Sequence, residues 1–205
     1  MNNKTNTESK NSEKLNKQLT FYAPTKQTLN ANRMPNHYMV KSNIASYLRT
    51  MGQKAGIEGH HHSQAAERLE AILVQEQLKT EKSRSRKRMN KAGETDEVIQ
   101  QKMTQIEKDL NVGKKPEEIQ VPYLFEHFTI KVTVFSLTKG RIDPPNFYPT
   151  IKHIIDGLTD ASWWEDDNFD QLVEMSFVYG GVTDLKGEYK FVLDIQETEK
   201  VNEQN

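Results

Sequence analysis

Residues 141–167 read RIDPPNFYPTIKHIIDGLTDASWWEDD, and they carry the clearest structural signal in the chain. Pro149 suits the first turn of a helix, where the N–H group that proline lacks would have no intrahelical partner. Four apolar residues then recur at i, i+3, i+4 and i+7, the spacing of one buried helix face: Ile151, Ile154, Ile155 and Leu158. The sequence therefore predicts an amphipathic helix packed on a core, preceded by a polar turn and followed by two tryptophans.

Charged side chains are concentrated on and around this helix. Lys152 and Asp156 are four residues apart and share one flank of it, whereas Asp143 precedes the helix and Asp166 and Asp167 follow it. Carboxylates around a lysine supply oxygen ligands for a hard cation such as Mg²⁺ and a positive charge for a scissile phosphate. A second interpretation stays open, because Lys152 and Asp156 also fit an ordinary i,i+4 ion pair on a surface helix.

The same residues carry a resemblance to a known family. Asp143-x-x-Asn146, Lys152, the Asp-Gly-Leu triplet at 156–158 and the Trp-x-Asp-Asp ending at 164–167 are together similar to the RusA family of Holliday-junction resolvases. The opening DPPNFYPT is most similar to phage and Gram-positive members, which carry DPxNxYPT. The resemblance covers residues 19–57 and 123–197.

The resemblance implies an α+β fold, a small mixed β-sheet packed by helices, in a homodimeric, Mg²⁺-dependent endodeoxyribonuclease of DNA recombination and repair. Such an enzyme resolves four-way DNA junctions by paired nicks, and Mn²⁺ is a plausible substitute cation. The implied metal ligands are Asp143 and Asp167, assisted by Asp166, and the implied catalytic lysine is Lys152. Two further residues of this stretch, Arg141 and Asn146, are expected to contact DNA.

One departure from the family pattern keeps a second function open. Where many members read Asp-x-Asp-Asn, this chain has Pro145 in place of the second carboxylate, and two extra residues separate Asn146 from Lys152. The alternative is a RusA-like DNA-binding or replisome adaptor that keeps the fold and has impaired chemistry.

Composition sets the outer bounds. The 205 residues suggest one domain, and 35% hydrophobic content with a mean hydropathy of -0.82 predicts that part of the chain is extended or disordered. We expect a disordered tail at 1–18, a domain at 19–197 interrupted by an insertion at 58–118, and a polar tail at 198–205. No long apolar run or signal pattern occurs, which predicts a cytoplasmic protein without a membrane span. Zero cysteines exclude disulfides, thiolate nucleophiles and cysteine zinc sites.

A short strand from Leu19 to Pro24 is predicted to lead into a polar loop. The N-A-N-R element of this loop resembles the first loop of the family, and phosphate contacts are the functional interpretation, against a plain polar surface. The expected contacts are Asn30, Asn32, Arg33, His37 and Lys41. A helix is expected to begin at Ser42 or Asn43 and to turn Ile44, Tyr47, Leu48 and Met51 inward.

The insertion at 58–118 predicts an antiparallel helical hairpin. Ser63 caps its first helix, Ala92-Gly93 turns the chain, and Thr95 begins the second helix, whose apolar residues have a/d spacing. Seven cations between residues 79 and 91 make the tip basic, and an electrostatic clamp on DNA phosphates is the functional interpretation. Its expected contacts are Arg84, Arg86, Lys87 and Arg88; a solvated charged arm is the alternative.

The remaining patterns concern strands and two clusters. Alternation predicts strands at 128–137, 171–178 and 188–195, the last two joined by a loop through Gly180, Gly181 and Gly187. The run of three histidines at 60–62 favours a linker or cap over a metal site, because consecutive residues point to different sides. Of the two tryptophans, one is expected to fill the core beside the Asp pair, and base stacking is the alternative.

Overall fold

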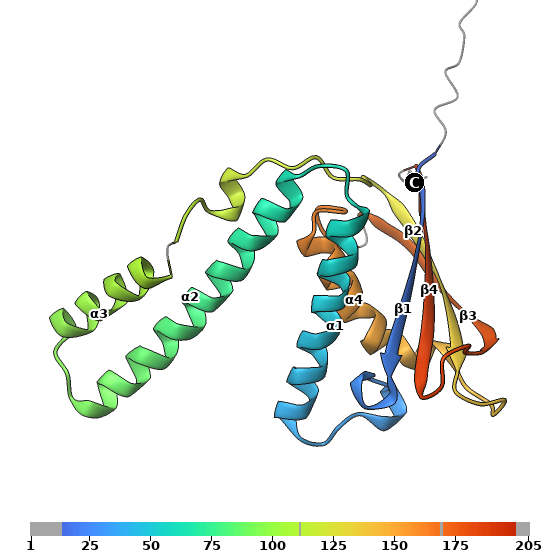
Figure 1. Cartoon of the computed structure of the whole chain (residues 1–205), viewed down its shortest axis with the longest axis horizontal. Coiled ribbons are helices and arrows are strands. Elements are labelled where there is room, and N and C mark those ends of the chain that lie inside the picture. The colour runs from blue at the N-terminus through green and yellow to red at the C-terminus, as the bar shows by residue number, and fades with distance from the viewer. Residues whose placement is uncertain (1–13, 111, 169, 200–205) are drawn as a thin grey trace, which may run out of the picture.

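The computed structural model describes residues 14–110, 112–168 and 170–199 and has an α+β fold (Figure 1). Its mixed sheet has the strand order β1–β4–β2–β3. The strands are β1 (Asn16–Pro24), β2 (Phe128–Ser136), β3 (Leu172–Val182) and β4 (Glu188–Glu197). β4 pairs antiparallel with both β1 and β2, whereas β2 and β3 are parallel. The predicted fold class, a small mixed sheet packed by helices, is confirmed.

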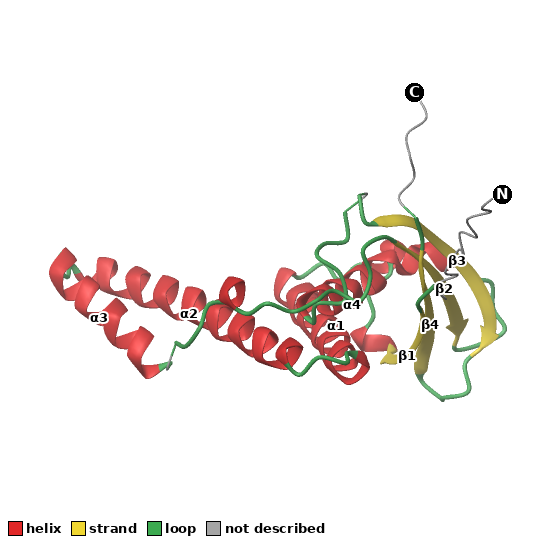
Figure 2. Cartoon of the chain, turned by 90° about the horizontal axis from the view of Figure 1, so that it is seen from above, coloured by secondary structure: helices red, strands yellow, loops and turns green. Residues whose placement is uncertain are grey.

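Two helices, α1 (Tyr38–Gly59) and α4 (Tyr148–Asp160), lie against one face of the sheet (Figure 2). α4 connects the parallel strands β2 and β3, and its four predicted apolar residues are fully buried. The inward residues of β2 are buried as its alternation predicted: Phe128, Ile130, Val132 and Val134. These two faces form the centre of the core and place α4 firmly on the sheet.

α1 crosses α4 at two glycines. A Cβ atom on Gly52 would lie 2.1 Å from the carbonyl oxygen of Ile154, and one on Gly157 would lie 2.1 Å from the carbonyl oxygen of Arg49. Glycine is therefore required at both positions, because any side chain there would meet backbone. Gly157 belongs to the Asp-Gly-Leu triplet, so the packing explains this part of the motif.

The predicted insertion forms an antiparallel hairpin of α2 (Gln64–Ala92) and α3 (Asp96–Asp109), called the arm below, which projects away from the sheet (Figures 1 and 2). Gly93 ends α2 with a φ of 75°, and Thr95 stands at the N-cap of α3, as expected, although its side chain forms no capping hydrogen bond. The arm has a small core of its own, made of Leu78, Ile99, Met103 and Ile106. Ser63 stands at the N-cap of α2, although its side chain forms no capping hydrogen bond.

The base of the arm is joined to the main body at Ser162. Arg68 of α2 donates a hydrogen bond to Ser162 Oγ at 2.7 Å, and His60 Nε2 donates to the Ser162 carbonyl at 3.2 Å. The N–H group of His62 donates to His60 Nδ1, so both ring nitrogens of His60 are used in its neutral form. Burial lowers the pKa of His60. The histidine run thus acts as a linker, as predicted.

Several predicted boundaries are wrong. β1 begins at Asn16, because backbone pairing with β4 orders polar residues 16–18 that bury little apolar surface; residues 1–13 and 200–205 of the predicted tails lie outside the described ranges. α1 begins at Tyr38 rather than at Ser42 or Asn43, since His37 Nδ1 caps it by accepting from Met39 N–H. Tyr47 is exposed, not inward, because the crossing with α4 uses the glycine side of α1.

Two further corrections concern the end of the chain. Gly180 and Gly181 lie inside β3 rather than in a loop, because β2 extends its pairing as far as Val182. Trp163 and Trp164 are both fully buried, so the base-stacking alternative is wrong. Within residues 14–110, 112–168 and 170–199, no helix has both the length and the apolar character needed to cross a bilayer.

Candidate functional site: a loop pocket and a lysine–carboxylate cluster

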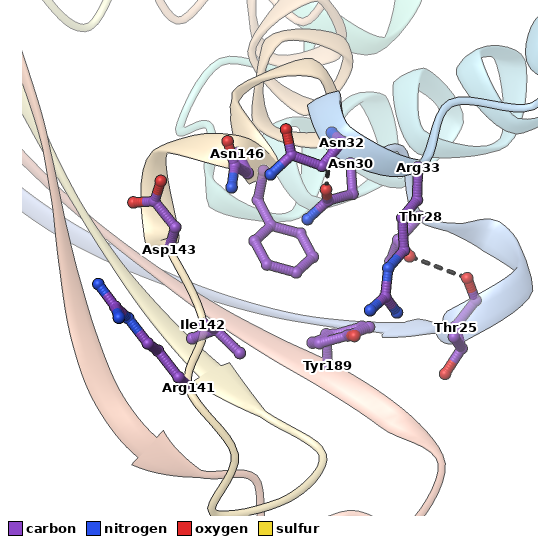
Figure 3. A pocket seen from close by; sticks show the side chains of 11 residues that line it. Thr25, Thr28, Asn30, Asn32, Arg33, Arg141, Ile142, Asp143, Asn146 and Tyr189 are labelled. Atoms are coloured by element: carbon purple, nitrogen blue, oxygen red, sulfur yellow. Dashed lines mark hydrogen bonds between the residues drawn. The ribbon is translucent and has the colours of Figure 1, made fainter.

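A pocket of about 520 Å³ lies between the β1–α1 loop, the β2–α4 loop and the start of β4 (Figure 3). It gathers six residues that the sequence nominated separately: Asn30, Asn32, Arg33, Arg141, Asp143 and Asn146. Two segments more than a hundred residues apart in the chain thus line one hollow, which is called the loop pocket below. Its mixture of amides, two cations and a carboxylate is suited to a polar, negatively charged ligand.

The β1–α1 loop is held over α4 by one buried side chain. Thr150 Oγ1 accepts a hydrogen bond from the N–H group of Leu29 and donates one to the carbonyl of Leu29, both at 2.7 Å. Leu29 itself is fully buried, and Asn30 then caps a 3-10 turn at Ala31–Arg33 by accepting from Asn32 N–H at 3.0 Å. The loop is therefore anchored to the helix that carries Lys152, although it is almost entirely polar.

A second group, the lysine–carboxylate cluster, consists of Lys152, Asp156 and Asp167. Lys152 Nζ forms a hydrogen-bonded ion pair with Asp156 and lies 2.7 Å from Asp167 Oδ2. The Asp167 side chain is only 14% exposed. The expected i,i+4 pair therefore exists, but it is part of a three-membered cluster that includes a residue from beyond the end of α4.

The charge of Lys152 is stabilised in this cluster. Burial opposes the charged form, but the hydrogen bonds and charge attraction from Asp156 and Asp167 exceed that effect and raise the pKa of Lys152. The lysine is thus a permanent cation at neutral pH, able to neutralise carboxylates or to hold a phosphate.

The buried tryptophans place Asp167 beside the helix. Trp163 Nε1 donates to the carbonyl of Gly56 at 2.8 Å, and Trp164 Nε1 donates to Thr159 Oγ1 at 2.7 Å. The ring of Trp164 also stacks on Phe128, with 4.1 Å between ring centroids. These contacts fold the segment after α4 back onto the helix, which is the reason that Asp167 reaches Lys152.

Asp166 and Asp143 occupy different positions from Asp167. The Asp166 carboxylate accepts hydrogen bonds from the N–H group of Asp167 at 2.9 Å and from the side chain of Asn168 at 3.0 Å, so it shapes the turn that presents Asp167. Asp143 is exposed at the loop pocket, on the side to which the Arg141 guanidinium extends (Figure 3). Among the described residues, neither Asp143 nor Asp166 forms an ion pair with Lys152.

The donor chemistry of these carboxylates fits Mg²⁺. This ion commonly takes one or two protein carboxylates and keeps several waters; the cluster offers Asp156 and Asp167, and the loop pocket offers Asp143. In the part of the chain that the structure describes, no three side chains of metal-binding type converge on one point.

Not every predicted DNA contact lies at the pocket. His37 caps α1 with its ring nitrogen, and Lys41 is exposed on the first turns of the same helix. On the arm, Arg86 and Lys87 line a hollow of about 650 Å³ with Lys79, Lys82 and Asn90. Arg84 instead pairs with Glu81 at 3.1 Å, and Arg88 is exposed. Lys79, Arg86 and Lys87 therefore line the hollow together with Lys82, which is paired with Glu107, whereas Arg84 and Arg88 lie outside it.

Three residues at or near the candidate site were not predicted from the sequence. Tyr189 lines the loop pocket, and the alternation of β4 did place it in phase with the buried Phe191, but nothing local indicates that it lies at a pocket rim. His153 approaches Asp156 at 3.3 Å. Arg49 forms a bidentate pair with Asp160 at 2.6 and 2.8 Å, which raises the pKa of Arg49 and joins α1 to the end of α4.

Comparison with protein-family models finds no family that matches this chain. Comparison with curated proteins likewise finds no relative. The resemblance to the RusA family therefore stays a prediction that rests on the motif residues.

Proposed function

We propose that this protein is a Mg²⁺-dependent endonuclease that cleaves branched DNA, with four-way junctions as its substrate, as the RusA resemblance implies. The observation that carries the proposal is the cluster in which Lys152 Nζ lies 2.7 Å from Asp167 Oδ2, on the helix that directly follows the pocket residues Asn146 and Phe147. A half-buried lysine between two carboxylates, together with a pocket that holds two arginines, is suited to phosphodiester hydrolysis.

Each residue has a definite role in this proposal. Asp143 and Asp167 would hold Mg²⁺, with Asp166 orienting Asp167 through the turn it shapes. When bound, the ion would activate water and stabilise the departing oxyanion. Lys152 neutralises the carboxylates in the free protein and turns to the scissile phosphate when DNA binds. Paired nicks require two equivalent sites, which a two-fold homodimer would supply.

A second candidate function, a DNA-binding adaptor with impaired chemistry, is favoured by two observations. Pro145 stands where many family members have a carboxylate, and it sits in the 3-10 turn Pro144–Phe147, where proline fixes the backbone. Lys152 also engages Asp156 and Asp167 together, which is a stable ion-pair arrangement without any metal. An adaptor would bind junction DNA in EDTA and would not nick it when Mg²⁺ is added.

The deciding experiment is cleavage of a labelled four-way junction by the purified chain and its variants. Asp143→Asn and Asp167→Asn should each abolish Mg²⁺-dependent nicking, while junction binding in EDTA survives or tightens because a negative charge is removed. Lys152→Ala should also stop cleavage but weaken binding. Asp170→Asn is the matched control, since Asp170 is an exposed carboxylate close to the cluster in the chain. Parental cleavage by both Asp143→Asn and Asp167→Asn would refute the site.

Pro145→Asp separates the two candidate functions. An active enzyme should gain little from the substitution or lose activity, because Pro145 also fixes the turn before α4. A protein that lacks activity solely for want of one ligand should regain cleavage. A parental chain that nicks junctions in Mg²⁺ would exclude the adaptor directly.

A further inference from the structure

The ring of Tyr189 forms an aromatic wall of the loop pocket. It is half-buried and is supported from within the core by Phe147, 4.8 Å away between ring centroids, and by Phe191, which stacks on it at 6.3 Å. Figure 3 shows the Tyr189 ring on one side of the pocket and the amide side chains on the opposite side. A supported ring of this kind offers a rigid flat surface to a ligand.

The side of the pocket opposite Tyr189 carries groups that can form hydrogen bonds with a planar, polar ligand. The amides of Asn30, Asn32 and Asn146 lie there together (Figure 3). Of these three, only the Asn30 side chain accepts a hydrogen bond from the protein, through its Oδ1 at the cap of the 3-10 turn. Among the described residues, the side-chain amides of Asn32 and Asn146 form no hydrogen bond with protein. Amide side chains present a donor and an acceptor side by side, which matches the edge of a nucleobase.

Charge and size restrict the ligand further. Arg33 and Arg141 bring two positive charges to the pocket, against the single carboxylate of Asp143. The volume of about 520 Å³ lies within the range of roughly 300–1,000 Å³ that is usual for small-molecule sites. A ligand with one aromatic ring system and one or two phosphates satisfies the wall, the amides and the arginines at once.

We propose that the loop pocket receives one unpaired nucleotide, whose base stacks on Tyr189, whose edge meets Asn32 and Asn146, and whose phosphate meets Arg33. A base inside a duplex has both faces covered and its pairing edge engaged, so only an unstacked base can enter. The inference deepens the proposed function and rests on it for the source of the nucleotide, because the bases at a branch point are the ones that can leave the stack. The pocket would then select the substrate next to Asp143.

The test uses two single-stranded probes with the same backbone charge, and EDTA is present throughout. One is a fluorescently labelled five-unit deoxyribose-phosphate backbone without bases, and the other carries a single thymine at its central position. Stacking on an aromatic side chain predicts that the intact protein binds the thymine probe about ten-fold more tightly. Tyr189→Phe should keep this ratio, whereas Tyr189→Leu should reduce it to about one. Tyr179→Leu, an exposed tyrosine of β3 outside the pocket, is the matched control and should behave as the parent.

The outcomes are separable from those of the cleavage assay. Equal affinity of the parent protein for the two probes would overturn the inference and leave a site for phosphate alone. A ratio that survives in Tyr189→Leu would also overturn it, and circular dichroism checks that this variant is folded. If Tyr189→Leu does not fold, Asn32→Ala together with Asn146→Ala replaces it, since these side chains are not part of the core. A protein that binds the thymine probe as predicted but never nicks DNA would contradict the proposed nuclease and not this pocket.

Discussion

Gly157→Ala tests the packing on which the candidate site depends. An added Cβ would lie 2.1 Å from the carbonyl oxygen of Arg49, 2.6 Å from the backbone nitrogen of Gln53 and 2.8 Å from Cα of Gly52. All three are backbone atoms of α1, so no side-chain rotation relieves the overlap. The two helices must therefore move apart at the place where α4 has to lie against the core.

The magnitude follows from two opposing effects. Alanine raises the helix propensity of this position by about 1 kcal/mol relative to glycine. Ordinary contact distances begin near 3.4 Å, whereas the added Cβ would lie 2.1 Å from the Arg49 carbonyl oxygen, so the helices must move apart by roughly 1.3 Å at this point. A gap of about 0.5–1 Å already removes a quarter to a half of each dispersion contact, and overpacked cores lose about 1–3 kcal/mol or more. Because the overlap is with backbone, we take the upper end of this range, about 3 kcal/mol, and subtract the gain in helix propensity of about 1 kcal/mol, so the expected net destabilisation is about 2 kcal/mol.

Urea denaturation followed by tryptophan fluorescence is a suitable assay, since Trp163 and Trp164 are both buried near this contact. The matched control is Gly113→Ala, where an added Cβ meets nothing within 4 Å; its free energy of unfolding should stay within about 0.5 kcal/mol of the parent or rise slightly. If Gly157→Ala were as stable as the parent, the close approach of α1 to α4 would be wrong, and so would the position assigned to Lys152.

Three further predictions address the pocket, the arm and the linker. Thr150→Val should destabilise the fold by about 2–3 kcal/mol and weaken junction binding, because the buried N–H and carbonyl groups of Leu29 lose their partner; unchanged binding would separate the loop from DNA recognition. Arg86→Ser with Lys87→Ser should lower the slope of log affinity against log salt by up to about 1.8, near 0.9 for each phosphate contact, and Arg84→Ser should change it less because Arg84 is paired; an unchanged slope would leave the arm a charged surface. Folding lowers the pKa of His60 below its ordinary 6.5, so the unfolded chain binds the proton first, and stability should be complete above that pH and fall as pH drops below it. The fall should be smaller in His60→Gln, and identical pH profiles from urea midpoints would count against the linker hydrogen bonds.

The three aspartates of the proposed site occupy different structural positions, which the motif alone does not show. Asp166 and Asp167 are neighbours in the chain, yet Asp166 orders a turn while Asp167 reaches Lys152. Asp143 belongs to the loop pocket rather than to the ion pair. Asp166→Asn should therefore retain more activity than Asp167→Asn in the junction assay, since the single side-chain oxygen of asparagine can still accept the hydrogen bond from the N–H group of Asp167.

The elements that could be predicted from the amino-acid sequence are those whose signal lies within a few consecutive residues. The period of α4 and the alternation of β2 identified their buried faces, because one apolar face against water is the dominant local constraint on a helix or a strand. The turn of the arm was found from another local signal: Gly93 ends α2 with a positive φ that glycine readily adopts, and Thr95 stands at the N-cap position of α3. The resemblance at 141–167 also named the residues that the structure gathers around α4.

Contacts between segments that are distant in the chain became known from the three-dimensional structure. The polar residues 16–18 form part of β1 because their backbone pairs with β4, and the pattern of their side chains does not indicate this pairing. Three features depend on partners that are distant in the chain. Gly157 packs on backbone atoms of α1, Trp163 and Trp164 are buried against Gly56 and Phe128, and Tyr189 lies at the loop pocket beside Phe147. Packing of this kind is decided by shape and by the loss of water from both partners at once, so a residue read with its neighbours alone does not contain it.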